Sequence, residues 1–258
     1  MTTLLISDLH LHPGAPEITD GFFTYLEQTA SKADALYILG DFFEAWVGDD
    51  ILDLPEAEPS GNAGLVKRVA KALNSLSSAG TAVYLMHGNR DFLIGKRFAD
   101  ACGATLLDDP TKLDNDGEPI LLMHGDSLCT RDEAYMAFRA QARDPQWQAQ
   151  ILAMSIPERL ALAKQIREQS GDANSNKAED IMDVTPDEVV KAMKAHGVAL
   201  LIHGHTHRPA IHDLTLNDQP AIRIVLGDWQ PDQGWDIRLE AGKAPELRDF
   251  PLDAPPSA

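Results

Sequence analysis

Cysteine and positive charge are both scarce in this chain. Its 258 residues include two cysteines, Cys102 and Cys129, without a CxxC pair. This excludes a disulfide framework and favours a reducing cytoplasm. Against 40 aspartates and glutamates stand 22 lysines and arginines, for a net charge of −18. Such a surface repels nucleic-acid phosphates and disfavours broad adhesion to anionic membranes. We therefore expect no nucleic-acid partner.

A long apolar run is also absent. No segment approaches the ~18 residues that a membrane-spanning helix needs. The start MTTLLISDLH lacks the basic region of a signal peptide, and Asp8 interrupts its apolar stretch. We expect a protein in solution, or one that binds a membrane only peripherally. Hydrophobic residues still make up 44% of the chain, and the length predicts one large domain or one domain with a sizeable insertion.

Six short apolar runs are each followed by polar residues. They are TLLISDLH, ALYILGD, AVYLMHGNRD, PILLMHGD, ALLIHGHTH and RIVLGDW. Runs of this length predict strands that are buried on both faces. Helical patterns at 18–33, 64–80 and 185–197 lie between several of them, so we expect an α/β layered fold. In open α/β sheets the functional site lies at the carboxyl ends of the strands, which is where the polar residues fall.

The last of these helices has start and stop signals. Thr185 is the expected N-cap, Pro186 suits the first helical position, and Gly197 ends the helix. Glu188 stands three residues after Thr185 and is expected to complete a capping box.

Two stretches interrupt the alternation. The acidic, Pro- and Gly-containing segment 48–62 predicts a surface loop, and 128–183 shows helical patterns without an obvious strand. We interpret 128–183 as a helical cap inserted on the active-site side of a core made of 1–127 and 184–250. The tail 251–258 is expected to be disordered.

Polar residues at the strand ends form a candidate metal site. They are Asp8, His10, Asp41, Asn89, His124, His205 and His207. Imidazoles and carboxylates without thiolates suit manganese, iron or zinc. Seven donors are too many for one tetrahedral ion but suit two ions that share a ligand. Such pairs, ~3.5–4 Å apart, stabilise the attacking and leaving oxygens of a displacement at phosphorus. We expect Asp41 to be the shared ligand and a bridging hydroxide to be the nucleophile.

Each of these residues alone has an ordinary explanation. A Gly-Asp pair after a strand is usually a turn, and a lone strand-end histidine such as His87 or His124 is more often a core residue. Their joint occurrence at strand ends supports the metal site. Spacing does not choose among His203, His205 and His207, because the three share one face if the strand stays extended.

The blocks DLH, GDFFEAW, GNRD, MHGD and GHTH resemble, in order, the five blocks of the calcineurin-like metallophosphoesterases. The resemblance implies a sandwich of two β-sheets flanked by helices. It assigns one ion to Asp8, His10, Asp41 and His207, and the other to Asp41, Asn89, His124 and His205. His203 and His87 then become strand residues near the site, and His12 a surface residue.

Arg90 stands where many members of this family carry histidine. Arginine cannot donate a proton at ordinary pH, but it can hold a phosphate oxygen bidentately. The exchange predicts a leaving group that needs no proton, such as a phosphate leaving from a pyrophosphate. A solvated surface charge is the alternative for Arg90. The candidate catalytic residues are Asp41, Asn89, Arg90 and His124.

Longer stretches, including LYILGDFFEAWVGDD, HGNRDFLIGKRF and DANSNKAEDIMDV, resemble the bacterial UDP-2,3-diacylglucosamine pyrophosphatases of lipid A biosynthesis. This resemblance implies water attack on the α-phosphate of a lipid-linked nucleotide sugar, giving UMP and 2,3-diacylglucosamine 1-phosphate. It also implies two Mn²⁺ ions and a place on the cytoplasmic face of the inner membrane, without an obligate protein partner. It assigns substrate binding to Asn89, Arg90, Asp132, Tyr135, Ser170, Asn174, Lys177 and His205.

The cap is then expected to cover acyl chains. Arg167 is a further candidate for substrate contact. The apolar residues expected to line an acyl groove are Trp46, Phe92, Leu93, Phe138, Leu160 and Ile166. The segment FLIGKRF (92–98) is expected to touch the membrane, with apolar side chains toward acyl tails and Lys96 and Arg97 toward head groups.

Three rival interpretations remain at this stage. A metallophosphoesterase acting on another nucleoside diphosphate compound or phosphodiester would carry the same metal site. A scaffold that had lost catalysis would lack ligands, whereas all seven are present. A nuclease of the same superfamily conflicts with the acidic charge balance.

Overall fold

The structure, a computed structural model, describes residues 1–57, 61–174 and 183–253, with the backbone alone for 169–174. Its centre is a pair of sheets, with six strands in the order β11-β10-β1-β2-β3-β4 and five in the order β5-β6-β7-β9-β8. The first sheet comprises β1 (Thr2–Ile6), β2 (Ala35–Leu39), β3 (Ala82–Met86), β4 (Ala104–Leu107), β10 (Gln233–Glu240) and β11 (Glu246–Pro251). The second comprises β5 (Thr111–Asn115), β6 (Glu118–Met123), β7 (Leu200–His203), β8 (Ala210–Leu216) and β9 (Gln219–Val225).

The six predicted apolar runs form parallel strands of both sheets. In the first sheet β1, β2 and β3 run parallel, and in the second β6, β7 and β9 do. The sequence interpretation missed β4, β5, β8, β10 and β11. All but β4 pair antiparallel with their neighbours, and β5 and β8 form the edges of the second sheet. Parallel strands end at the same edge, so the polar residues after the six runs converge.

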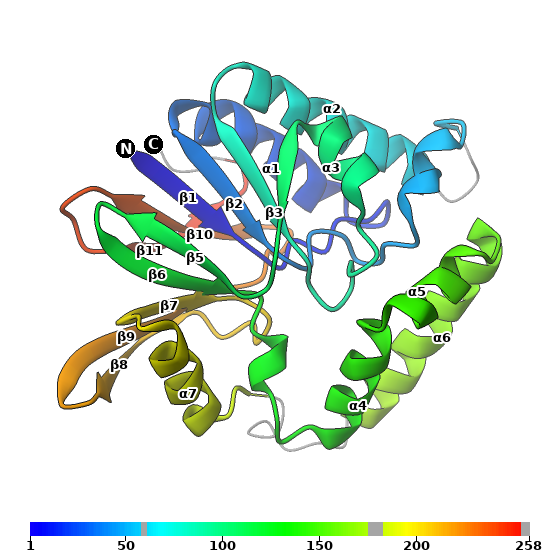
Figure 1. The fold of residues 1–258 in the computed structure, drawn as a ribbon. Coiled ribbons are helices and arrows are strands. Elements are labelled where there is room, and N and C mark those ends of the chain that lie inside the picture. The colour runs from blue at the N-terminus through cyan, green and yellow to red at the C-terminus, as the bar shows by residue number, and fades with distance from the viewer. Residues whose placement is uncertain (58–60, 175–182, 254–258) are drawn as a thin grey trace.

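Helices cover the outer face of each sheet (Figure 1). On the first sheet lie α1 (Pro16–Gln28), α2 (Asn62–Ser78) and α3 (Lys96–Cys102), and on the second lies α7 (Pro186–His196). A short 3₁₀ helix, η1 (Ala30–Lys32), follows α1. The predicted fold class, a β-sandwich flanked by helices, is confirmed. Among the described residues no helix is long and apolar enough to cross a lipid bilayer.

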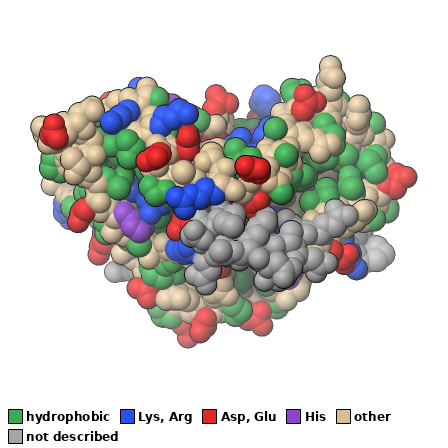
Figure 2. All heavy atoms as spheres, turned by 90° about the horizontal axis from the view of Figure 1, so that it is seen from below, with side chains coloured by type: hydrophobic (Ala, Val, Ile, Leu, Met, Phe, Trp, Pro, Cys, Tyr) green, Lys and Arg blue, Asp and Glu red, His purple; other side chains and the backbone are tan. Residues whose placement is uncertain are grey.

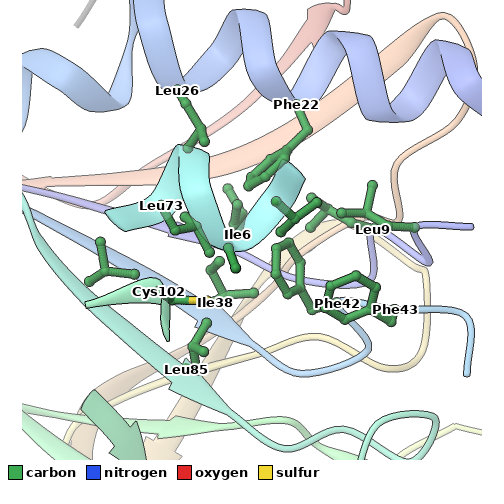
Figure 3. Close-up of a cluster of buried hydrophobic side chains, with 14 of the residues drawn as sticks. Ile6, Leu9, Phe22, Leu26, Ile38, Phe42, Phe43, Leu73, Leu85 and Cys102 are labelled. Atoms are coloured by element: carbon green, nitrogen blue, oxygen red, sulfur yellow. The ribbon is translucent and has the colours of Figure 1, made fainter. Parts of the chain in front are cut away.

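Strand alternation divides the buried side chains between layers. Leu5 and Leu39 point between the two sheets, whereas Ile6 and Ile38 point toward the helices. Figure 3 shows Ile6 and Ile38 beneath Phe22 of α1, in the cluster that also holds Leu26 and Leu73. Burying a leucine or phenylalanine stabilises the folded state by about 1.5–3 kcal/mol. Side chains on both faces of these strands therefore stabilise the sheets that carry the site.

The cap helices lie outside both sheets, beside the strand ends (Figure 1). They are α4 (Glu133–Ala142), α5 (Pro145–Leu152) and α6 (Ile156–Asn174), all inside the stretch 128–183 in which no strand was expected. The division of the chain into a core and a separately folding cap stays a prediction.

Three local expectations need correction. Thr185 is the N-cap of α7, but no capping box forms, because its hydroxyl accepts a hydrogen bond from the Thr130 hydroxyl at 2.8 Å instead of one from the helix. The loop at 48–62 begins with a 3₁₀ helix, η2 (Asp49–Asp53). The tail is ordered at its start, since Pro251 ends β11 and Leu252 is buried. Residues 254–258 lie outside the described part of the chain.

Candidate active site

The candidate ligands converge where the parallel strands of both sheets end. Asp8 and His10 follow β1, Asp41 follows β2, and Asn89 follows β3. His124 follows β6, just before the 3₁₀ helix η3 (Asp126–Leu128), while His205 and His207 follow β7. Side chains from the two sheets meet in two clusters, in each of which the donor atoms lie within 4.8 Å of one another. One cluster is Asp8, His10 and His207, and the other is Asp41, His124 and His205.

Asp41 lies between the two clusters. Its Oδ1 is 3.7 Å from His124 Nε2 and its Oδ2 is 4.0 Å from His10 Nε2. Asn89 Oδ1 lies 3.0 Å from the same nitrogen of His124. One carboxylate thus offers an oxygen to each cluster, the arrangement that the sequence interpretation expected of a shared ligand.

Left-handed backbone is concentrated at these ligands. Eight described non-glycine residues have a positive φ, and three of them, Asp116, Asn217 and Asp218, lie in hairpin turns. The other five are all predicted ligands: Asp8 (φ 56°), His10 (50°), Asp41 (48°), His205 (69°) and His207 (55°). This conformation costs a non-glycine residue about 1–2 kcal/mol. Such strain gathers where function requires a particular side-chain direction.

Two glycines explain the GN and GH motifs. A Cβ on Gly88 would lie 2.1 Å from Asp41 Oδ1, and one on Gly204 would lie 2.2 Å from Asp8 Oδ2. Both backbones therefore press directly against a candidate ligand, and neither position has room for a side chain.

The charges of the site set different protonation states on its histidines. Burial lowers the pKa of His124, but the carboxylates of Asp41 and Asp8 outweigh it and raise that pKa to about 9. Burial, with His124 nearby, lowers the pKa of His205 to about 3. Burial raises the pKa of Asp8, but neighbouring His207 and the charge of His124 hold that pKa below its usual range. The carboxylates thus hold a proton on His124, whereas His205 is neutral. Ligation of a metal ion by His124 requires that this proton leaves.

One buried atom tests whether a cation fits. Asp8 Oδ2 accepts hydrogen bonds from the Ser7 hydroxyl and from His205 N at 2.9 Å. Asp8 Oδ1 is buried and accepts no hydrogen bond from any described residue, and it faces His207 Nε2 at 3.4 Å. A buried carboxylate oxygen left free in this way, facing an imidazole nitrogen, fits a divalent cation.

Two acidic residues that the sequence interpretation did not propose as site residues support the first cluster. Glu44 Oε2 lies 3.1 Å from His10 Nδ1, and Asp228 Oδ2 lies 3.5 Å from His207 Nδ1. In the second cluster a backbone oxygen takes the place of the carboxylate, since His124 Nδ1 lies 2.9 Å from Leu39 O. Asp228 could have been found, because it ends the sixth apolar run. Glu44 carried no such signal.

The remaining histidines lie apart from the clusters. His203 ends β7 and is fully buried, which lowers its pKa to about 4, and its Nδ1 contacts Gly204 O at 2.8 Å. His87 Nε2 is 2.6 Å from Ile94 O, and His12 Nδ1 accepts a hydrogen bond from Gly14 N. This distribution agrees with the choice of His205 and His207 as the donors.

Known proteins match both the architecture and the motifs. Residues 1–209 match the family described as calcineurin-like phosphoesterase. This chain belongs to the calcineurin-like phosphoesterase family. The predictions of a hydrolase of this family and of a divalent-metal centre are thereby confirmed, while the identity of the ion stays a prediction.

Relatives that cover nearly the whole chain share one name, UDP-2,3-diacylglucosamine hydrolase. The chain is 61% identical to the protein of that name from Chromohalobacter salexigens, over 98% of this chain and 99% of the relative. It is 57% identical to that from Cellvibrio japonicus and 51% identical to that from Pseudomonas aeruginosa, in each case over 93% of this chain and 96% of the relative.

The metal clusters open into a cavity. It has a volume of about 680 Å³. Its polar end includes His10, Asp41, Asn89, Arg90 and His205. Its apolar wall comes largely from the cap and from the loops after β2 and β3, and includes Trp46, Phe92, Leu93, Phe138, Trp147, Ile151, Leu162, Ala163 and Ile166. Of the predicted apolar lining only Leu160 is misplaced, because it packs against the first-sheet core.

The predicted substrate-binding residues are placed as follows. Asn89, Arg90, Asp132, Tyr135 and His205 line the cavity. Asp132 caps α4 by accepting a hydrogen bond from Tyr135 N at 3.0 Å, and the Tyr135 hydroxyl donates to buried Asp126. Ser170 and Asn174 belong to the last turns of α6, where the side chains lie outside the described part, and Lys177 lies outside it altogether.

The segment expected to touch the membrane is buried in part. Ile94 and Phe98 are buried in the first-sheet core. Lys96 pairs with Asp100 at 2.6 Å and Arg97 with Asp53 at 2.5 Å. Phe92 is half-buried, and the Lys96 and Arg97 side chains are exposed although each is paired. Membrane contact of residues 92–98 stays a prediction.

Proposed function

We propose that this chain hydrolyses the pyrophosphate bond of UDP-2,3-diacylglucosamine. The observation that carries the proposal is a single cavity with the two donor clusters at one end and a wall of aromatic and aliphatic side chains along the other. A substrate with a diphosphate and two acyl chains matches both ends. The shared name of the nearly full-length relatives supports the same substrate.

The proposed reaction is a displacement at the α-phosphorus. The oxygen of water bonds to that phosphorus, and the bond from phosphorus to the bridging oxygen breaks. The products are UMP and 2,3-diacylglucosamine 1-phosphate. The leaving oxygen departs as part of a phosphate, which is stable as an anion at neutral pH, so no side chain has to protonate it. Arginine at position 90 agrees with this chemistry.

The seven donors would hold two divalent cations, with Mn²⁺ as our first choice. When bound, such a pair supplies positive charge for the phosphoryl group and lowers the pKa of water. Within the chain, Asp41 presents one oxygen to each cluster. Asn89 and His124 are fixed against each other beside it. Asp41, Asn89, Arg90 and His124 form the proposed catalytic group.

The diphosphate is expected to meet two arginines. Arg90 and Arg167 both line the cavity and approach the same carboxylate, that of Glu44. The acyl chains would lie along Phe92, Phe138 and Trp147, whose rings are 6.0–6.5 Å apart between centroids. Tyr135, Asp132, Ser170, Asn174 and Lys177 stay proposed contacts of the substrate.

We further propose weak attachment to the cytoplasmic face of the inner membrane, since the substrate is a lipid. Figure 2 shows hydrophobic side chains gathered on the side where the cap helices lie, and Leu152 of α5 is 44% exposed. Washing native membranes with increasing salt tests this. Full recovery in the soluble fraction without salt would count against it.

Product analysis tests the proposed reaction. The purified protein with Mn²⁺ is given UDP-2,3-diacylglucosamine, UDP-glucose or bis-p-nitrophenyl phosphate. We expect UMP and 2,3-diacylglucosamine 1-phosphate from the first and far slower turnover of the others. Preference for UDP-glucose or the phosphodiester would instead support a phosphoesterase acting on another nucleotide or diester.

A further inference from the structure

Glu44 occupies a central place between the metal clusters and the cap. It lies in the loop after β2, with its side chain 21% exposed at the cavity wall. One oxygen, Oε2, lies 3.1 Å from His10 Nδ1. The other, Oε1, lies 3.5 Å from Arg90 Nη1 and 3.0 Å from Arg167 Nη1. One carboxylate therefore contacts a candidate metal ligand and two arginines.

The two oxygens have separable tasks. Glu44 Oε2 lies beside Nδ1 of His10, while Nε2 of the same ring faces His207 Nε2, 3.3 Å away, and the oxygen of Asp41. Carboxylates placed behind metal-binding histidines orient the ring and make it a stronger donor. Asp228 has the same relation to His207, but no arginine approaches it within ion-pair distance among the described residues.

The arginine side of Glu44 links two parts of the fold. Arg90 belongs to the loop after β3, whereas Arg167 belongs to α6 of the cap. Among the described residues, Glu44 is the one acidic side chain within 4.0 Å of either guanidinium. Arg167 Nη2 also donates to the backbone oxygen of Glu44 at 3.2 Å. Two cations from separate segments are thus held beside each other at the polar end of the cavity.

We propose that Glu44 is a positioning residue with two roles, orienting His10 for the first ion and holding Arg90 and Arg167 ready for the diphosphate. The second role rests on the proposed function, and the first does not. Without the charge of Glu44, Arg90 and Arg167 would lose the carboxylate that holds them side by side, although both would remain in the protein. The cost should then appear as weaker substrate binding as well as weaker metal binding.

Direct titration of metal-free protein with Mn²⁺ tests the first role. Glu44→Gln keeps the size of the side chain and removes its charge. We expect this variant to raise the Kd of the Mn²⁺ ion next to His10 about tenfold. Asp228→Asn is the matched variant on His207 and is expected to do the same. Asp53→Asn, which removes an exposed partner of Arg97, should leave both ions unaffected. Parent-like Mn²⁺ binding in Glu44→Gln would overturn this role.

Kinetics at saturating Mn²⁺ test the second role. Glu44→Gln is expected to raise KM for UDP-2,3-diacylglucosamine about tenfold with a smaller change in kcat. Asp228→Asn should keep KM within twofold. In an Arg167→Ala background, Glu44→Gln should raise KM by clearly less than in the parent, because one of its partners is already gone. Equal KM effects of Glu44→Gln and Asp228→Asn, or strictly multiplicative effects with Arg167→Ala, would overturn the link to the arginines.

The two measurements also separate this proposal from the proposed function. If the parent protein does not turn over UDP-2,3-diacylglucosamine, the proposed function fails. The Mn²⁺ titration still decides whether Glu44 orients His10. If the parent turns over and Glu44→Gln matches it in both assays, the Glu44 proposal alone fails.

Discussion

The helices on the first sheet and the helices of the cap are built in opposite ways. Of the 17 residues of α2, seven are buried, including Leu65, Val69 and Leu73 along one face. In α4, α5 and the part of α6 with described side chains, the only buried residues are Ala142 and Arg159. A buried apolar face anchors α2 along its length, and the cap has no such face.

Arginines also attach the cap to the core. Arg159 donates to Val47 O and pairs with Asp50, and Arg143 Nη2 donates to Gly88 O at 2.9 Å. Arg139 Nε donates to Asp126 at 2.9 Å. All three reach loops that follow strands β2, β3 and β6. The comparison teaches that the metal clusters rest on a fully packed scaffold. The cap is held by half-buried apolar side chains such as Ile156 and Leu160 and by polar contacts that can be removed singly.

Loss of Asp41, the shared ligand, or of His124 beside it should have the largest effect, because a donor at the centre of the metal site is removed. We predict that Asp41→Ala and His124→Ala each lower kcat at least about a thousandfold, or ~4 kcal/mol in activation free energy. Release of UMP measures this, with circular dichroism as the control for folding. Parent-like turnover in both variants would remove the proposed site.

Arg90 lies on the boundary between the two regions. We predict that Arg90→Ala lowers kcat/KM about a hundredfold, or ~2.7 kcal/mol, because a charged contact to the phosphate is lost. Folding and bound Mn²⁺, measured by elemental analysis, should match the parent. If the rate also matches, Arg90 is not a phosphate clamp.

The polar attachment of the cap is tested by a matched pair of arginines. Arg159, with 3% of its side chain exposed, and Arg97, with 52% exposed, each pair with an aspartate of the loop after β2. We predict that Arg159→Met raises KM about tenfold and speeds proteolysis within 133–174, since a buried guanidinium loses its contacts with Asp50 and Val47 O. Arg97→Met should change neither by more than about twofold, because exposed pairs contribute little. Equal effects would contradict this contrast.

The smallest expected effect concerns pH and the buried carboxyl beneath α4. Burial, with Asp126 nearby, raises the pKa of Asp109 to about 6 from an ordinary value of 3.8. The folded state thus favours the neutral carboxyl. Its contribution to the free energy of unfolding is fully present below about pH 4 and is lost as pH rises through about 6. Asp109→Asn, always neutral, should gain about 1–2 kcal/mol over the parent at pH 7.5 relative to pH 4.5, a difference that already includes the attraction of Arg139.

Urea unfolding at the two pH values measures this difference. An advantage of Asp109→Asn that is the same at pH 4.5 and pH 7.5 would show that the carboxyl does not titrate between them.

The sequence predicted the packed part of the molecule better than the cap. Continuous apolar runs identified the six parallel strands, because burial on both faces leaves that signal in the residues themselves. Half-buried strands such as β8 and β10 carry a weaker alternating pattern and were missed. Leu160 was assigned to the cavity because composition cannot tell which way a half-buried helical side chain points.

The same reasoning explains which site residues were found. Asp8, Asp41 and His124 follow directly on strands, so topology alone brings them together. Arg167 was proposed as a substrate contact, but its partner Glu44 lies 123 positions away in sequence and carries no local signal. Nor could residue type reveal that five ligands would adopt left-handed backbone.

Anomalous diffraction from Mn²⁺-loaded crystals tests the central claim most directly. The account predicts two peaks ~3.5–4 Å apart, one beside Asp8, His10 and His207 and one beside Asn89, His124 and His205, with the Asp41 carboxylate between them. A single peak, or two peaks that do not share Asp41, would contradict it.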